Sequence, residues 1–382
     1  MRMADCTAKE GPAWKEHALI LALILVAASL ALVLLGWAHH WFWRGYLSPK
    51  DVPDEVHTVR TADGWRIGIR RYLPKGDKRY AEPVVLCHGL GANHYNLDWD
   101  PPYGLAQALA AEGRDCWVVS LRGHDGSDRP TAFNPLRWGF SFDDYLRFDV
   151  PAVLDHVTAS TSVPKVQWVG HSMGGMLAYA LGGGPYERIL AGGVVAVASP
   201  SSFSNQPYLR SVARLGKWLA RSSRVPQRFV THMIAPFMGH FNLPFSEIAI
   251  APQSMDGRLV RRLQAWAFED ISAGVARQFD DWVSNDAFRS LDKSQDYRSA
   301  MGAFTAPVLV MGGSSDKMAP PRCMEDAHRR LGSADKTLVI LGKELGASFD
   351  YGHGDLMLGR AAPGEVYPQI ARWLEARATR VG

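Results

Sequence analysis

Residues 166–175 read VQWVGHSMGG, and this stretch decides the predicted fold. The apolar run Val166–Val169 is typical of a buried strand, and the helical run Met173–Leu181 begins directly after Ser172. Ser172 stands in the pattern Gly-x-Ser-x-Gly, in which small residues allow a tight turn with the serine at its tip. A strand, this turn and a helix in succession predict a nucleophile elbow. The alternative is a glycine-rich turn with a bystander serine.

Strands and helices alternate on both sides of this stretch. Apolar runs that predict further strands lie at Pro83–Cys87, Cys116–Leu121, Gly193–Ala198, Val308–Met311 and Thr337–Leu341. Helical patterns separate them, at Gly104–Glu112, Asp143–Ala159, Arg322–Leu331 and Pro368–Ala378. Such alternation predicts a mostly parallel central sheet with helices on both faces. Ahead of it, His57–Thr61 and Arg66–Leu73 flank an Asp-Gly pair and predict an antiparallel hairpin.

A serine nucleophile needs a base, and the base needs a group that orients it. A sheet with a nucleophile elbow places these in the chain order serine, acid, histidine. Asp316 and His353 each follow a predicted strand, in that order. The sequence therefore predicts a catalytic triad of Ser172, Asp316 and His353. Asp350 and Asp355 are alternative acids, but neighbours of a histidine in sequence rarely face its ring correctly.

The residues after strand Pro83–Cys87 read His-Gly-Leu-Gly, and glycine lets a backbone approach a substrate closely. The backbone N–H groups of Leu90 and Met173 are predicted to form an oxyanion hole. Five further residues are candidates for contact with a substrate, namely His88, Gly89, His171, Phe237 and Phe241. His88 is expected to be structural rather than a base, because it precedes the nucleophile and lies on the oxyanion side.

These motifs together resemble the α/β-hydrolase superfamily. Within it, the chain is most similar to microbial lipases and esterases related to the acid (lysosomal or gastric-type) lipases. The segments that carry this likeness are EVHTVRTADGWRIGIRRYLP at 55–74, HGLGANHYNLDW at 88–99 and YGHGDLMLG at 351–359. The resemblance implies an α/β-hydrolase fold with an inserted cap. One departure is RGHDGS at 122–127, where relatives usually read RGHGxS, and it puts the geometry of that loop in question.

Residues 18–38 read ALILALILVAASLALVLLGWA, without a charge, and are long enough to span a bilayer. Aromatic residues typical of the headgroup zone lie at its distal end, namely Trp37, Trp41, Phe42, Trp43 and Tyr46. The alternative is a cleaved signal peptide, whose apolar run is shorter and ends at a small-residue cleavage site. Length and flanks favour a retained single-pass anchor.

Basic residues differ slightly in number on the two sides of this run. Arg2, Lys9 and Lys15 precede it, together with the amino terminus. Arg44 and Lys50 follow it. The positive-inside rule therefore leans towards a non-cytoplasmic main domain.

The composition excludes several other classes of protein. The 382 residues carry a net charge of +4, too mild for a nucleic-acid binder. The four cysteines are scattered with no CxxC pair, which argues against a zinc module and a disulfide-rich scaffold. No metal ion or organic cofactor is implied, and the oligomeric state is left open.

Four regions are predicted: a tail at 1–17, an anchor with its aromatic girdle at 18–43, a core at 50–200 and 306–382, and a helical cap at 201–305. Between Arg188 and Ser246 the cap has no acidic residue. Five basic residues are spaced to share one helix face, namely Arg210, Arg214, Lys217, Arg221 and Arg224. Such a face suits anionic headgroups. The alternative is a helix that packs on the cap and whose charges are merely solvated.

The sequence thus predicts a membrane-anchored serine hydrolase of carboxylic esters, with lipid or medium- to long-chain acyl substrates and no nucleic-acid partner. An acyltransferase or a thioesterase with the same triad is the first alternative. A non-catalytic membrane scaffold on a hydrolase fold is the second.

Overall fold

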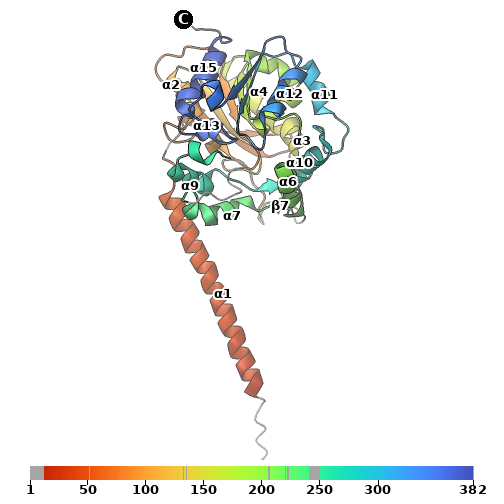
Figure 1. Ribbon diagram of the computed structural model, residues 1–382. Helices are drawn as coiled ribbons and strands as arrows, with labels where there is room; N and C mark the ends of the chain where they lie inside the picture. Colours follow the sequence, from red (N-terminus) through yellow and green to blue (C-terminus); the bar gives the residue numbers. More distant parts are fainter. Residues whose placement is uncertain are drawn as a thin grey trace, which may run out of the picture. The chain divides into compact units, whose positions relative to one another are not determined.

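The computed structural model describes residues 13–381, except for 51, 132, 135, 205–206, 220, 222 and 241–249. The chain divides into two compact units, Met1–Leu47 and Ser48–Gly382. The first unit contains one long helix, α1 (Ala13–Tyr46) (Figure 1). Apolar side chains between Leu19 and Tyr46 are exposed on it. Its segment His17–Tyr46 is long and apolar enough to cross a membrane, and it contains the whole of the predicted anchor, residues 18–43. It is a candidate anchor by its length and composition alone, and a signal sequence shares both properties.

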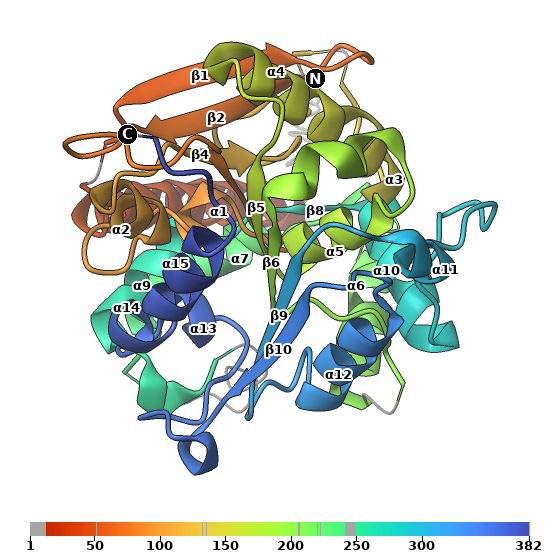
Figure 2. The same ribbon diagram turned by 90° about the horizontal axis from the view of Figure 1, so that it is seen from above.

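The second unit is built on an eight-stranded sheet in the order β1-β2-β4-β3-β5-β6-β9-β10 (Figure 2). The strands are β1 (Glu55–Arg60), β2 (Arg66–Tyr72), β3 (Val84–Cys87), β4 (Cys116–Ser120), β5 (Gln167–His171), β6 (Val194–Val197), β9 (Val308–Gly313) and β10 (Lys336–Leu341). The first two form the predicted antiparallel hairpin, and the strands from β3 onward pair in parallel. The predicted sheet is therefore confirmed.

Helices cover both faces of this sheet, as a parallel sheet requires (Figure 2). Helices α2 (Leu105–Ala111) and α15 (Tyr367–Glu375) lie together on one face. Helices α4 (Val150–Thr161), α5 (Met173–Ala180) and α12 (Pro321–Arg330) lie on the other. Their apolar sides bury strands that are themselves apolar on both sides.

The helix predicted over Asp143–Ala159 is interrupted near its start. A short turn, α3 (Phe142–Asp144), leads into a π-helical segment, Tyr145–Asp149, before α4 begins. A π segment inserts an extra residue into the helix and redirects its side chains. Here it ends at the buried Asp149, whose carboxylate binds Arg122.

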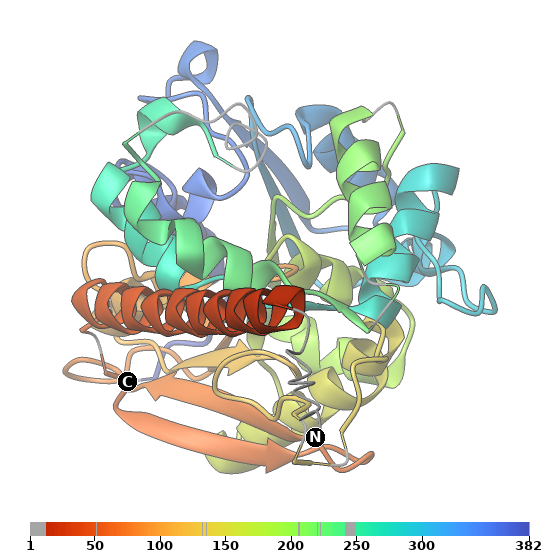
Figure 3. The same cartoon turned by 90° about the horizontal axis from the view of Figure 1, so that it is seen from below.

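Adjacent strands β6 and β9 are separated in sequence by a largely helical insertion. It contains α6 (Pro207–Leu219), β7 (Arg224–Val225), α7 (Gln227–Ile234), α9 (Gly257–Trp266), β8 (Ile271–Ser272), α10 (Ala273–Asn285) and α11 (Tyr297–Ala300). Helix α6 packs on α10, and α7 packs on α9, and these two pairs are seen in Figure 3. We call this insertion the cap, with the predicted bounds 201–305. Those bounds stay a prediction, since cap and sheet lie in one compact unit.

The predicted basic helix face is wrong in its second half. Helix α6 ends at Leu219, so Arg221 and Arg224 lie beyond it. Arg224 belongs to strand β7, and its Nε lies 2.8 Å from Asp270 Oδ2. Strand pairing with β8 and this carboxylate override the helical spacing, and neither contact is visible in local sequence. Arg210 and Arg214 are exposed on α6, whereas the Lys217 side chain lies outside the described residues.

Candidate active site

Ser172 occupies the turn between strand β5 and helix α5. Its backbone lies at φ 53° and ψ −118°, in a strained region that non-glycine residues rarely adopt. The Ser172 N–H donates to the Val197 carbonyl at 2.7 Å, which ties the turn to the end of β6. The nucleophile elbow expected from the sequence is therefore the local conformation.

The glycines around Ser172 are required by close backbone packing. A Cβ on Gly170 would lie 2.3 Å from the Gly175 nitrogen. A Cβ on Gly174 would lie 2.2 Å from the Cys87 carbonyl oxygen, at the end of β3. The motif therefore lets helix α5 begin directly against two strand ends, which brings Ser172 close to the loop after β3.

Asp316 and His353 form a hydrogen-bonded pair. The His353 Nδ1 lies 2.8 Å from Asp316 Oδ2, and both residues are buried. The other carboxylate oxygen, Oδ1, accepts the backbone N–H groups of Met318 and Ala319, each at 2.8 Å. Those two bonds fix the carboxylate so that Oδ2 points at the imidazole. This is the orientation that an acid needs to hold a catalytic histidine in one tautomer.

The two alternative acids face other groups. Asp350 accepts from the Ser314 hydroxyl and the Lys343 N–H, both at 3.0 Å. Asp355 is buried and accepts the N–H groups of Gly352 and Ala251, at 2.8 and 3.0 Å. Asp316 is therefore the acid that the structure pairs with His353.

His171 joins the elbow to the loop that carries His353. Its Nε2 lies 3.0 Å from the His353 backbone carbonyl, and its Nδ1 lies 2.8 Å from the side-chain amide of Asn96. The rings of His171 and His353 have centroids 5.0 Å apart. Because Ser172 directly follows His171, these contacts bring the serine and histidine segments together. Both nitrogens of His171 are engaged by protein groups, and its predicted contact with a substrate stays a prediction.

The loop after β3 lies against Ser172. A Cβ on Gly89 would lie 3.0 Å from Ser172 Cβ, so this loop approaches the serine as closely as a glycine permits. In the described part of the chain, neither the Leu90 N–H nor the Met173 N–H donates to a backbone acceptor outside its own helix or strand. Both groups are thus left for another acceptor, as the predicted oxyanion hole requires.

His88 supports this loop from behind. It is fully buried, its Nδ1 lies 2.9 Å from the Gly89 carbonyl, and its Nε2 accepts the Leu121 N–H at 3.1 Å. Burial lowers the pKa of His88 well below its ordinary value, so the ring is neutral. With both nitrogens bound to backbone, His88 has no polar atom for a substrate. The structure thus places it as a support of this loop, and its predicted contact with a substrate stays a prediction.

The two phenylalanines of the cap are less informative. Phe237 follows α7 and is 61% exposed, and Phe241 lies outside the described residues. Their predicted contact with a substrate, like that of Gly89, stays a prediction.

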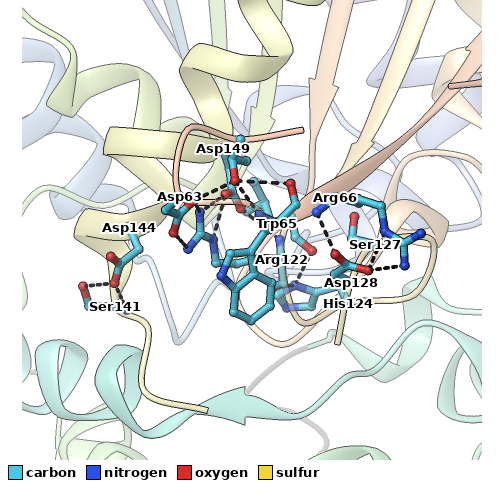
Figure 4. Close-up of polar contacts among 12 residues, drawn as sticks. Asp63, Trp65, Arg66, Arg122, His124, Ser127, Asp128, Ser141, Asp144 and Asp149 are labelled. Carbon is cyan, nitrogen blue, oxygen red and sulfur yellow. Dashed lines mark hydrogen bonds and ion pairs between the residues drawn. The ribbon is translucent and has the colours of Figure 1, made fainter. Parts of the chain in front are cut away.

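The unusual RGHDGS loop is anchored by an ion-pair cluster in which Arg122 and Asp149 are buried and Asp63 is exposed (Figure 4). The Arg122 guanidinium donates to Asp149 at 2.7 Å and to Asp63 at 2.6 and 3.0 Å, and it lies over the Trp65 ring. Burial raises the pKa of Asp149 to about 6, against the opposing effect of Arg122. The cluster joins the loop to the β1–β2 turn and to the π segment before α4.

The end of the same loop is fixed separately (Figure 4). Arg66 donates to Asp128 at 2.8 Å, and the Ser127 hydroxyl accepts the Gly68 N–H at 2.7 Å. His124 Nδ1 lies 2.9 Å from the Arg122 carbonyl. The loop is therefore ordered by its own contacts, despite the departure from the pattern of its relatives.

Comparison with known proteins agrees with this geometry. A family model described as alpha/beta hydrolase fold matches residues 82–359. The gastric triacylglycerol lipase of Mus musculus is 25% identical over 91% of this chain and 98% of its own length. The human gastric triacylglycerol lipase is 26% identical over 91% of this chain and 97% of its own length. The expected relation to acid lipases is thus confirmed.

Solved structures support the fold. A monoglyceride lipase from Saccharomyces cerevisiae aligns with a TM-score of 0.60 and 18% identity, over 86% of this chain and 97% of the other. An esterase from Thermogutta terrifontis aligns with a TM-score of 0.57 and 18% identity, over 85% of this chain and 100% of the other. With the family model covering most of the sequence, the chain belongs to the α/β-hydrolase family.

Proposed function

We propose that this protein is a membrane-anchored serine hydrolase that cleaves the carboxylic esters of lipids through Ser172, His353 and Asp316. Membership of the family and the lipase relatives make the chain an ester hydrolase. The observation that carries the detailed proposal is the buried His353–Asp316 hydrogen bond of 2.8 Å, on a loop joined to the strained turn of Ser172.

The proposed reaction begins when His353 Nε2 takes the Ser172 hydroxyl proton and Oγ attacks the ester carbonyl carbon. Asp316 Oδ2 stabilises the imidazolium through Nδ1–H. The negative charge on the former carbonyl oxygen is received by the Leu90 and Met173 N–H groups, where each donor contributes on the order of 3 kcal/mol in comparable sites. The intermediate then collapses, and the leaving alkoxide takes the proton from His353.

The second half of the reaction releases the acid. Water attacks the acyl carbon of the Ser172 ester while His353 Nε2 takes a water proton. Collapse of this second intermediate breaks the bond to Oγ, which takes that proton back. Each step uses side chains and backbone groups of this chain.

Lipid esters are the proposed substrates because two features agree. Two relatives are named for triacylglycerol hydrolysis and one structural neighbour for monoglyceride hydrolysis. Helix α1 is also long and apolar enough to anchor the enzyme in a bilayer, where such esters reside. An acylglycerol-like ester is therefore the substrate class that we favour.

The cap carries exposed apolar side chains that suit a lipid surface. Leu215 and Trp218 on α6 are each 57% exposed, and Phe229 on α7 is 68% exposed. Arg210 and Arg214 are exposed on the same α6 helix. Apolar side chains beside cations are typical of helices that lie on anionic bilayers. We propose that these exposed side chains of α6 and α7 contact the membrane. Phe229→Ser should therefore slow the hydrolysis of esters held in vesicles and leave the hydrolysis of soluble esters unchanged.

The main test is hydrolysis of p-nitrophenyl esters from acetyl to palmitoyl in detergent, by wild type and by Ser172→Ala. Turnover should be lost in Ser172→Ala at every chain length, and wild type should prefer medium or long acyl chains. Full activity in Ser172→Ala would overturn the assignment of the nucleophile. An acetyl optimum with no activity on long chains would overturn the lipid substrate but not the triad.

A further inference from the structure

The segment that follows cap helix α9 pairs with the loop after β3. Ala92 and Phe268 form a β-bridge, and the Glu269 N–H donates to the Gly91 carbonyl at 2.8 Å. The Asn93 N–H donates to the Ala267 carbonyl at 3.1 Å. Leu90, whose N–H is the proposed oxyanion donor, thus lies between Gly89, which contacts Ser172, and Gly91, which is bonded to the cap.

The Glu269 side chain gathers donors from several segments. Its carboxylate is buried at 2% exposure. Oε1 accepts from the Asn93 side chain at 3.0 Å and from the Asp125 N–H at 3.2 Å. Oε2 accepts from Arg129 at 2.8 Å, and the Arg228 Nε lies 3.8 Å away on α7. One carboxylate therefore connects the cap, the oxyanion loop and the RGHDGS loop.

Opposing influences act on this carboxylate. Burial is the largest influence and raises the pKa of Glu269, as does the charge of Asp125, whereas Arg228 and the Asn93 hydrogen bond lower it; the net pKa is about 7. Every polar contact described above is a donor, so the ionised form satisfies them all. A proton on either oxygen would face one of these donors and weaken its bond.

We propose that Glu269 is a positioning residue for the reaction, whose carboxylate holds the loop Gly89–Asn93 so that the Leu90 N–H faces the oxyanion. The cap would then hold the oxyanion loop in position, in addition to covering the sheet. This inference rests on the proposed function, since it needs the oxyanion hole. No contact between Glu269 and substrate is required.

The matched variants are Glu269→Gln and Glu187→Gln. Glu187 is also buried, and it accepts the N–H groups of Gly183 and Ala306 at 2.7 and 3.1 Å. Because Ala306 precedes β9, Glu187 lies towards the amino ends of the strands, away from Ser172. Both substitutions keep the size of the side chain and replace a buried carboxylate by an amide, so we expect a similar loss of stability from each. They differ in their distance from the oxyanion loop.

Glu269→Gln should lower kcat on p-nitrophenyl acetate about tenfold, less than the 100- to 1,000-fold loss typical when a donor is removed outright. Affinity for an alkyl boronic acid, whose tetrahedral adduct places an oxygen in the oxyanion hole, should fall by a similar factor. KM should change little. Glu187→Gln should keep wild-type kcat and boronate affinity even where its thermal stability falls.

The pH dependence separates positioning from general destabilisation. The ratio of wild-type to Glu269→Gln kcat should be largest at pH 8.5, where Glu269 is ionised, and should shrink at pH 5.5, where it is protonated. If Glu269→Gln does not fold, Arg129→Gln removes one partner and should give a smaller loss with the same trend.

Three outcomes are decisive. Wild-type kcat and boronate affinity in a folded Glu269→Gln would overturn the inference, as would equal losses in Glu187→Gln. A ratio that does not vary with pH would also overturn it. Activity in Ser172→Ala, measured alongside, would overturn the proposed function instead, so the two failures are distinguishable.

Discussion

Substitution of Gly89 by alanine tests how closely the oxyanion loop approaches the nucleophile. The new Cβ would lie 3.0 Å from Ser172 Cβ and 3.4 Å from both the His171 Nδ1 and its carbonyl oxygen. Ordinary contacts of a Cβ begin at 3.4 Å, so Ser172 or the loop must move by a few tenths of an ångström. The backbone of Gly89 does not have a positive φ, so alanine adds no torsional strain there.

The expected magnitude follows from this displacement. A misplacement of 1 Å can cost about 100-fold in rate, so a shift of a few tenths should cost about tenfold in kcat/KM. That is about 1.4 kcal/mol of transition-state stabilisation. Overpacking of the same site should destabilise the fold by about 1 kcal/mol. The rate and the stability should therefore both fall, and the rate loss should persist well below the melting temperature.

The assay is hydrolysis of p-nitrophenyl butyrate at 15 °C, with active enzyme counted by titration with a fluorophosphonate. Gly364→Ala is the control, because nothing lies within 4 Å of a Cβ at that position in helix α14 (Ala362–Glu365). It should leave kcat/KM unchanged. Wild-type kcat/KM in a stable Gly89→Ala would refute the close approach of this loop to Ser172.

Three other predictions follow from the same contacts. Asp316→Asn should lower kcat about 10,000-fold with the fold retained, since the amide would present N–H to His353 Nδ1; stopped ester assays and circular dichroism test this. Gly174→Ala should destabilise the chain by at least 1–3 kcal/mol, as expected for overpacking, because its Cβ would meet the Cys87 carbonyl at 2.2 Å; urea unfolding measures it. Glu269 has a folded-state pKa of about 7 against an ordinary 4.5, so between these values the folded chain holds a proton that the unfolded chain releases. Its contribution to the free energy of unfolding should therefore fall by about 3 kcal/mol as pH rises through this window, and urea titrations of Glu269→Gln should lack that fall.

The parts of the site that could be predicted are those governed by local chain geometry. The tight turn at Ser172 could be predicted because the glycine spacing is a steric requirement of that turn, as the 2.2 Å approach of a Cβ on Gly174 to the Cys87 carbonyl shows. The pairing of Asp316 with His353 could be predicted because parallel strands end at one edge of the sheet, so residues that follow them meet there.

The parts that could not be predicted depend on contacts between distant segments. Glu269 binds Asn93 across 176 positions, and nothing near it in sequence marks it as a partner of the oxyanion loop. Arg224 was expected on a helix because its spacing fits, yet pairing with Asp270 places it in β7. His88 belongs to the His-Gly-Leu-Gly motif, which is typical of an oxyanion loop. Its ring is buried, and both of its nitrogens bind backbone groups instead. The periodicity of a sequence indicates which face of a helix or strand a residue occupies. It does not indicate which residue of a distant segment it will contact.

Covalent labelling shows which residue of the chain is the nucleophile, and we expect Ser172. The full chain in detergent would be treated with a fluorophosphonate, digested, and its modified peptide sequenced by mass spectrometry. One adduct is expected, on Ser172, formed in step with loss of ester hydrolysis and slowed strongly by His353→Ala. Loss of ester hydrolysis with the adduct on another residue, or an enzyme that keeps hydrolysing esters after Ser172 is fully labelled, would contradict this expectation.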